Sequence, residues 1–133
     1  MAGENVDDIN PPEDAEMTQI DLDEILGQVV QEDEKLGKKL DIRILNSSSL
    51  GARVHEKIRS KIEGALREDT RLRIRIPRDV IGITPDFLEA MFSHSLDDIK
   101  SVEDFRRVFN VSANIDVKVQ IMRAIQALLL ERH

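Results

Sequence analysis

The residues of this chain that could do chemistry are three histidines, a few hydroxyls and many carboxylates. His55, His94 and His133 lie far apart in the sequence, and no two of them have the spacing of metal ligands. There is no cysteine, which excludes disulfides and thiolate chemistry. There is also no G-x-S-x-G motif, and the adjacent acids Asp97 and Asp98 are typical of a solvated helix end. The sequence therefore predicts no catalytic residue, no metal site and no cofactor, and indicates a protein that is not an enzyme.

One run of hydroxyls could hold a phosphate group. Ser47, Ser48 and Ser49, followed by Gly51, precede a helix predicted over residues 50–67, and helix N-termini bind anions. No G-x-x-x-x-G-K-[ST] motif accompanies them. Ordinary capping of the helix is the favoured interpretation. An enzyme acting on a small phosphorylated ligand remains an alternative.

The candidate binding site is a loop between a predicted strand and a predicted helix. Thr84, Pro85 and Asp86 are an N-cap residue, a proline at the first helical position and an acid in the first turn. Thr84 is the only hydroxyl of this loop and hence its one candidate for phosphorylation, although capping is its favoured role. We expect a protein partner to contact six residues: Gly82, Ile83, Thr84, Pro85, Asp86 and Phe87.

Four arginines lie on or beside the strand that precedes this loop: Arg71, Arg73, Arg75 and Arg78. Three of them alternate with apolar residues, which is the period of a strand with one buried face and one wet face over residues 71–76. The wet face could be solvated, or it could contact an acidic partner, including the N-terminal part of the chain itself. Nucleic acid is the third alternative, and the lack of aromatic residues on this strand argues against it.

The N-terminal part of the chain divides into two segments. Its composition predicts a flexible acidic tail over residues 1–20. An amphipathic helix follows over residues 21–36, with the apolar positions Leu22, Ile25, Leu26, Val29 and Val30. A helix this short needs a surface to pack on. It could pack on its own domain, where it is a candidate cover for the wet sheet face, or it could dock on another chain and form a homodimer or a larger assembly.

Charge and composition limit the classes of protein to consider. Residues 1–35 contain 12 Asp or Glu and one Lys, a net charge of -11, which leaves 14 Asp or Glu and 18 Lys or Arg, a net charge of +4, in residues 36–133. The acidic segment would repel nucleic acid. Apolar residues make up 41% of the chain, and the four phenylalanines are its only aromatics, so we expect an aliphatic core. No run of residues is long and apolar enough to span a membrane and no signal peptide is evident, so the expected location is the cytoplasm.

The segment DVIGITPDFLEAMF resembles the strand-loop-helix motif of STAS-like domains, a bacterial family related to anti-sigma factor antagonists. The resemblance extends over residues 40–131: LDIRILNSSSLGARVHEKIRSKI matches an opening strand and first helix, RRVFNV a late strand, and DVKVQIMRAIQALL a closing helix. It implies an α/β domain over residues 40–133, with a small sheet and helices mainly on one face, preceded by the acidic tail and the extra amphipathic helix. Periodicity independently predicts alternating strands and helices, and hence parallel strands joined by crossovers.

The resemblance also implies a function, namely regulation by protein-protein contact through the loop Gly82 to Phe87. Anti-sigma factor antagonists use this loop to contact a kinase-like anti-sigma factor, which phosphorylates a serine in it. Here the family's usual serine is replaced by Asp86, so the phosphorylation switch does not carry over. The alternative function is a structural subunit that docks or dimerises through the helix Leu22 to Val30.

Overall fold

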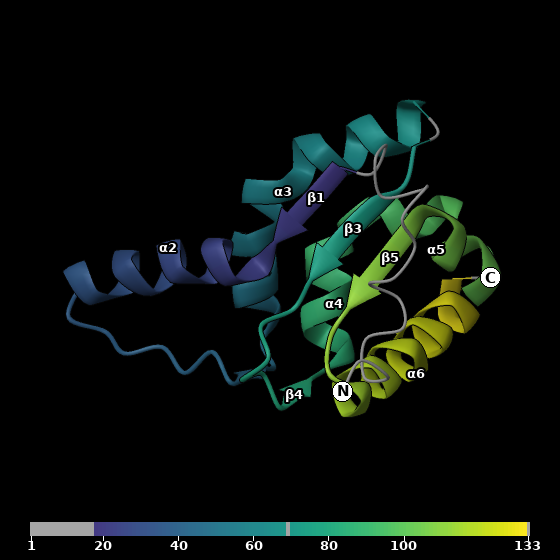
Figure 1. Cartoon of the computed structure of the whole chain (residues 1–133). Coiled ribbons are helices and arrows are strands. Elements are labelled where there is room, and N and C mark those ends of the chain that lie inside the picture. Colours follow the sequence, from purple (N-terminus) through teal and green to yellow (C-terminus); the bar gives the residue numbers. More distant parts are fainter. Residues whose placement is uncertain (1–17, 69, 133) are drawn as a thin grey trace, which may run out of the picture.

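Three parallel strands form the sheet of this molecule (Figure 1). They are β1 (Thr18–Asp21), β3 (Leu72–Arg75) and β5 (Phe109–Ser112), in the spatial order β1-β3-β5. In the sheet register Ile74 lies between Ile20 and Val111. Parallel neighbours need long crossover connections, and helices supply them here. The structure therefore confirms the α/β class.

The structure is a computed structural model and describes residues 18–68 and 70–132. Its helices are α2 (Leu22–Lys35), α3 (Ser48–Glu68), α4 (Pro85–Phe92), the 3-10 helix η2 (Ser93–Asp98), α5 (Val102–Val108) and α6 (Ile115–Arg132). Figure 1 shows α3 and α4 together behind the three strands, with α6 along one side of the molecule. Among these helices, none is long and apolar enough to cross a membrane.

A second, two-stranded ladder lies apart from the sheet. It pairs β2 (Ile44–Leu45) with β4 (Gly82–Ile83) in parallel. Residues 42–45 were expected to open the main sheet, and this expectation is wrong. The central strand is instead flanked by β1, which has three of its four residues in the segment expected to be an acidic tail over residues 1–20. A strand of four residues with one buried side chain carries too weak a pattern to be recognised without its neighbour. The part of that expected tail before residue 18 lies outside the described residues.

The core contains more aromatic packing than its composition suggested. Phe92, Phe105 and Phe109 form one cluster, with ring centroids 4.9 to 5.4 Å apart. Two of the three contacts are edge-to-face, an arrangement that aromatic rings favour. All four phenylalanines, including Phe87, are buried. The core is otherwise made of aliphatic side chains and Met91, as expected, and the few aromatics all lie within it.

The expected late strand begins further along the chain than the pattern suggested. The segment RRVFNV was matched to this strand, but its first three residues end α5, and β5 begins at Phe109. Ser101 caps α5, since its Oγ accepts a hydrogen bond from the Asp104 backbone N-H at 3.1 Å. A short helix in front of a strand, both rich in apolar residues, is not separable by periodicity alone.

Candidate protein-interaction site

The loop that precedes α4 is fixed to the strand beside it by backbone hydrogen bonds. The N-H groups of Ile81 and Gly82 both donate to the carbonyl of Arg43, at 2.7 and 3.3 Å. The Thr84 N-H donates to the Leu45 carbonyl at 3.0 Å. Each of these three backbone N-H groups has a carbonyl acceptor, and these hydrogen bonds stabilise the loop in this conformation.

Two amide side chains hold the other side of the loop, those of Gln120 in α6 and of Asn114 directly before it. Gln120 Oε1 accepts from the Ile83 N-H at 2.9 Å, and its Nε2 donates to the Ile81 carbonyl at 3.3 Å. Asn114 Nδ2 donates to the Val80 carbonyl at 3.1 Å. Its Oδ1 accepts from the Val117 N-H at 3.0 Å, so Asn114 caps α6. Gln120 was missed in the sequence because a polar residue on a helix is typical of a solvated surface.

The first turn of α4 matches its expected capping. Thr84 is the N-cap residue, and its Oγ1 accepts from the Phe87 N-H at 3.5 Å. Pro85 and Asp86 follow it, and both are exposed. The Asp86 carboxylate lies in the first turn, where the helix dipole stabilises negative charge. The Thr84 hydroxyl is half-buried and engaged as a cap, which leaves capping as a sufficient account of this residue.

An exposed apolar surface lies directly beside this turn. Ile81 is 62% exposed and Ile44 is 43% exposed. A Cβ placed on Gly82 would lie 3.7 Å from Ile44 Cγ2, so the side chain of Ile44 borders the glycine backbone. We call the accessible set the loop surface; its members are Ile44, Ile81, Gly82, Pro85 and Asp86.

Only part of the predicted contact set reaches this surface. Ile83 and Phe87 are buried in the core and cannot contact a partner without unpacking, so the contact role expected for their side chains is wrong. Ile44 and Ile81 were missed, since one apolar residue among polar neighbours has no distinguishing pattern in the sequence. The Asp41 carboxylate at the rim accepts two hydrogen bonds from the Arg43 guanidinium, and these lower the pKa of Asp41.

The arginines lie on the sheet face opposite to α3 and α4, as the alternation predicts. Leu72 and Ile74 point into the core, whereas Arg71 and Arg73 are half-buried on the other face and Arg75 is exposed. Arg71 Nη2 donates to the Arg106 carbonyl at 3.0 Å. Arg78 lies beyond the end of β3 and is exposed. The arginines do not join the loop surface, so an acidic partner of this face would be a separate contact.

The helix α2 packs on its own chain. Leu22, Leu26 and Val29 are fully buried, while Ile25 and Val30 are partly buried. The helix contacts α3, so it does not cover the arginine face, and that expectation is wrong. Burial of three of the five proposed docking residues removes most of the apolar face that a second chain would need.

Ion pairs fasten the C-terminal half of α2 to α3. Arg53 donates to Asp33 at 2.8 Å and to Glu32 at 3.1 Å, and Lys57 donates to Glu32 at 2.9 Å. These hydrogen bonds, first that of Lys57 and then that of Arg53, lower the pKa of Glu32. The pKa of Arg53 is raised by its hydrogen bonds to Asp33 and Glu32. The cluster joins residues about twenty positions apart and had no visible pattern in the sequence.

The serine run has the structural role that was favoured for it. Ser47 Oγ accepts from the Leu50 N-H at 3.0 Å and caps α3. Gly51 is buried, and a Cβ there would lie 2.4 Å from the Phe87 carbonyl oxygen. The glycine therefore allows the close contact of α3 with α4. Its backbone is covered by α4, so it would not be available to bind a phosphate.

Two of the three histidines lie among the described residues, and His133 lies outside them. His55 is half-buried with its Nδ1 2.9 Å from the Met91 carbonyl oxygen, whereas His94 is almost fully exposed. Within residues 18–68 and 70–132, no three His, Cys, Asp or Glu residues are grouped so that they could hold a metal ion. Comparisons of the chain with protein-family models, with curated proteins and with solved structures found no match.

Proposed function

We propose that this protein acts by binding another protein through the loop surface, without catalysing a reaction. The observation that carries the proposal is the pairing of exposed apolar side chains with a fixed backbone. The side chains of Ile44 and Ile81 are exposed, yet the backbone of the loop is hydrogen-bonded to residues 43–45 and to Gln120 of α6. A preformed surface loses little conformational entropy on binding, which favours affinity.

The chemistry of the surface indicates the kind of partner. Two isoleucines and a proline supply apolar area, and Asp86 at a helix N-terminus supplies one fixed negative charge. A partner would present an apolar patch with a cationic side chain opposite Asp86, because charge complementarity sets orientation and specificity. The resemblance to STAS-like domains suggests partner switching with a kinase-like anti-sigma factor as the specific form of this contact. In that case Asp86 would act as a permanent negative charge where antagonists carry a phosphorylated serine.

The test is affinity capture from extract of the native cell, with the partner identified by mass spectrometry. Two site variants are compared with the intact chain: Asp86→Arg and Ile81→Asp. Both residues are exposed, so the fold should survive the changes. Asp23→Arg is the matched control, since Asp23 is also an exposed acid in the first turn of a helix.

We expect one protein to be retained by the intact chain and by Asp23→Arg, and to be lost from both site variants. Circular dichroism of all four proteins establishes that they are folded. Retention of the same proteins by the intact chain and by the site variants would show that the loop is scaffold and would overturn the proposal.

A further inference from the structure

A group of positive charges lies on the sheet face opposite to α3 and α4. In Figure 1 these two helices are behind the strands, and none of the helices that the structure describes crosses the front of β1 and β3. Arg71 and Arg73 lie on this front face and are half-buried. The Arg71 side chain reaches the end of α5, where its Nη2 donates to the Arg106 carbonyl at 3.0 Å. With one lysine of α6 they form what we call the basic cluster: Arg71, Arg73, Arg106 and Lys118.

A hollow of about 220 Å³ lies at the basic cluster. The described residues that line it include Arg71, Arg106 and Lys118, and none of them is Asp or Glu. Partial burial lowers the pKa of Lys118, and a carboxylate brought beside its ammonium group would offset that cost. The hollow therefore favours an occupant that carries negative charge.

One polar residue of this hollow sets a second requirement. Asn110 lies beside Arg73 in the sheet register and also lines the hollow. It is only 6% exposed, and its Oδ1 is buried with no hydrogen-bond partner among the described residues. A buried acceptor without a donor is unfavourable, so the preferred occupant brings a donor as well as negative charge. An acidic peptide has both, because its backbone N-H groups accompany its carboxylates.

The chain carries such a peptide directly before β1. Residues 1–17 contain six Asp or Glu and no Lys or Arg. They lead into Thr18, whose N-H donates to the Arg71 carbonyl at 3.3 Å, so they join the sheet beside the basic cluster. Glu16 and Glu13 are two and five residues before Thr18, which places both acids within about 17 Å of the start of β1. The distance across the sheet from β1 to β5 is only about 10 Å, so these acids can reach the whole cluster.

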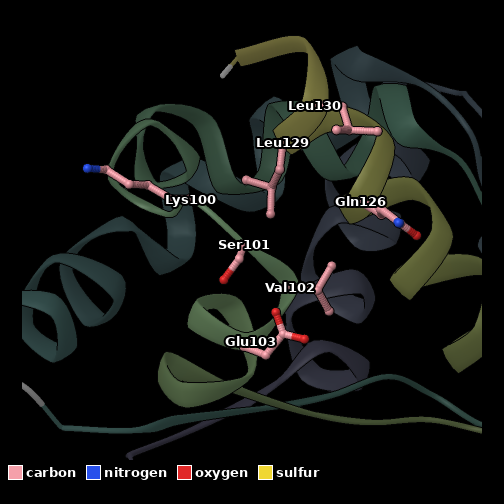
Figure 2. Close-up of a pocket in the computed structure, with 7 residues that line it drawn as sticks. All are labelled: Lys100, Ser101, Val102, Glu103, Gln126, Leu129 and Leu130. Carbon is pink, nitrogen blue, oxygen red and sulfur yellow. The ribbon is translucent and has the colours of Figure 1, made fainter.

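A larger hollow elsewhere does not offer the same match (Figure 2). It has a volume of about 630 Å³ and lies between the start of α5 and the last turns of α6. One cation, Lys100, and one anion, Glu103, line it beside apolar side chains such as Val102 and Leu129. Its charges therefore do not select an acidic peptide, and Lys100 provides a control position.

We propose that residues 1–17 bind in cis to the basic cluster and cover the arginine face of the sheet. The six acids of this segment complement the four cations of the cluster, and this complementarity gives the contact its specificity. Because the segment is joined to β1, its effective concentration at the cluster is high, and another anionic molecule binds there only by displacing it. The contact uses a different surface from the loop surface and does not depend on the proposed function.

The test is paramagnetic broadening in NMR spectra of the full chain. The chain has no cysteine, so Asn5→Cys provides a single attachment point for a nitroxide and leaves every acid in place. The backbone amide signals of Arg73, Asn110 and Lys118 should be broadened at about 0.01 M salt. The broadening should be lost at about 1 M salt, because the Debye length falls from about 30 Å to about 3 Å.

Two variants of the labelled chain test whether the charges cause the broadening. The first replaces the six acids with their amides: Glu4→Gln, Asp7→Asn, Asp8→Asn, Glu13→Gln, Asp14→Asn and Glu16→Gln. The second reverses two charges of the basic cluster, through Arg106→Glu and Lys118→Glu. Both should lose the broadening at low salt, whereas the control Lys100→Glu should retain it, since Lys100 lies at the other hollow.

Circular dichroism establishes that these variants are folded. The amide variant changes no residue that the structure describes, so it remains decisive if the charge reversal disturbs the fold. Broadening that is equal in the intact chain and in the amide variant, or absent from both, would overturn the proposal. The basic cluster would then be open to an acidic molecule other than this segment.

Discussion

Gly51 shows how a single residue decides whether two helices can meet. Its backbone faces the backbone of α4, and an added Cβ would lie 2.4 Å from the Phe87 carbonyl oxygen and 2.9 Å from the Ala90 Cβ. Glycine normally weakens a helix. At this position the loss is offset by the close approach of α3 to α4, the helix that follows the loop surface.

Replacing Gly51 tests this balance. Gly51→Ala should lower the free energy of unfolding by about 1–3 kcal/mol, because the methyl group meets backbone that cannot yield. Gly64→Ala is the control in the same helix, since a Cβ there meets only the far end of Arg67 at 3.9 Å. The control should raise stability by up to about 1 kcal/mol. Urea unfolding measures the free energy of unfolding of both variants. If Gly51→Ala and Gly64→Ala change it in the same direction, close packing at Gly51 is not the explanation.

Thr84 is the second residue whose role can be isolated. Thr84→Val removes the hydroxyl that caps α4 and should cost about 1 kcal/mol of stability. Thr84→Ser keeps an acceptor oxygen and should lose little. If capping is the whole role of Thr84, partner capture by Thr84→Val stays intact. Loss of the partner from a folded Thr84→Val variant would instead assign the hydroxyl to the interface.

At the scale of elements, the packing of α2 combines a buried apolar stripe with a surface ion cluster. Leu22, Leu26 and Val29 provide the stripe, and Glu32 with Lys57 provides one exposed pair. Surface pairs of this kind contribute little energy. They join the C-terminal half of α2 to α3, since Arg53 and Lys57 of α3 both donate to Glu32 of α2.

The Glu32 pair predicts a pH dependence. The pKa of Glu32 in the folded chain lies below its ordinary value of 4.5. A lowered carboxylate pKa adds stability above the unfolded-state pKa, and this is lost as the pH falls through the folded-state pKa. The melting temperature of the intact chain should therefore exceed that of Glu32→Gln at neutral pH, and the two should converge as the pH drops below 4.5. If the difference in melting temperature between the intact chain and Glu32→Gln stays constant down to strongly acidic pH, the charge of Glu32 does not contribute to stability.

At the scale of the whole molecule, the segment 18–35 belongs to the domain. It supplies an edge strand and a helix, and Ile20, Leu22, Leu26 and Val29 are all buried. Full burial of each such side chain is worth about 1.5–3 kcal/mol, whereas domains of this size are stable by only about 5–15 kcal/mol in total.

Removing residues 1–36 should therefore abolish the cooperative fold. The truncated chain is expected to show no cooperative thermal transition, measured by circular dichroism and calorimetry. The intact chain with Leu26→Asp should be strongly destabilised in the same way, because a charge would be buried without a partner. A truncated chain that still melts cooperatively would mean that α2 is an accessory to a domain complete without it.

Much of the local structure was predictable from neighbouring residues. The helices α2, α3, α4 and α6 follow apolar residues at helical spacing. Their starts follow hydroxyl, amide or carboxylate caps, as at Thr84 and Asn114. These features depend on contacts within a few positions of the chain, so the sequence displays them directly.

The candidate site was predictable only in part. Pro85 and Asp86 are exposed as expected, but the accessible apolar residues Ile44 and Ile81 come from segments that the fold brings beside them. The hydrogen bonds of Gln120 likewise join α6 to a loop 37 positions earlier. The spacing of apolar residues along the sequence does not predict contacts between segments so far apart.

The sequence by itself determined the α/β class, the helical segments, their caps and the alternation that puts Arg73 and Ile74 on opposite faces of β3. Tertiary structure decided which strands pair, so that β1 joined the sheet and β2 did not. It also decided that α2 lies on α3 and that Gly51 is a packing residue. The physical reason is that capping and periodicity act between near neighbours, whereas pairing and close packing depend on residues that only the folded chain brings together.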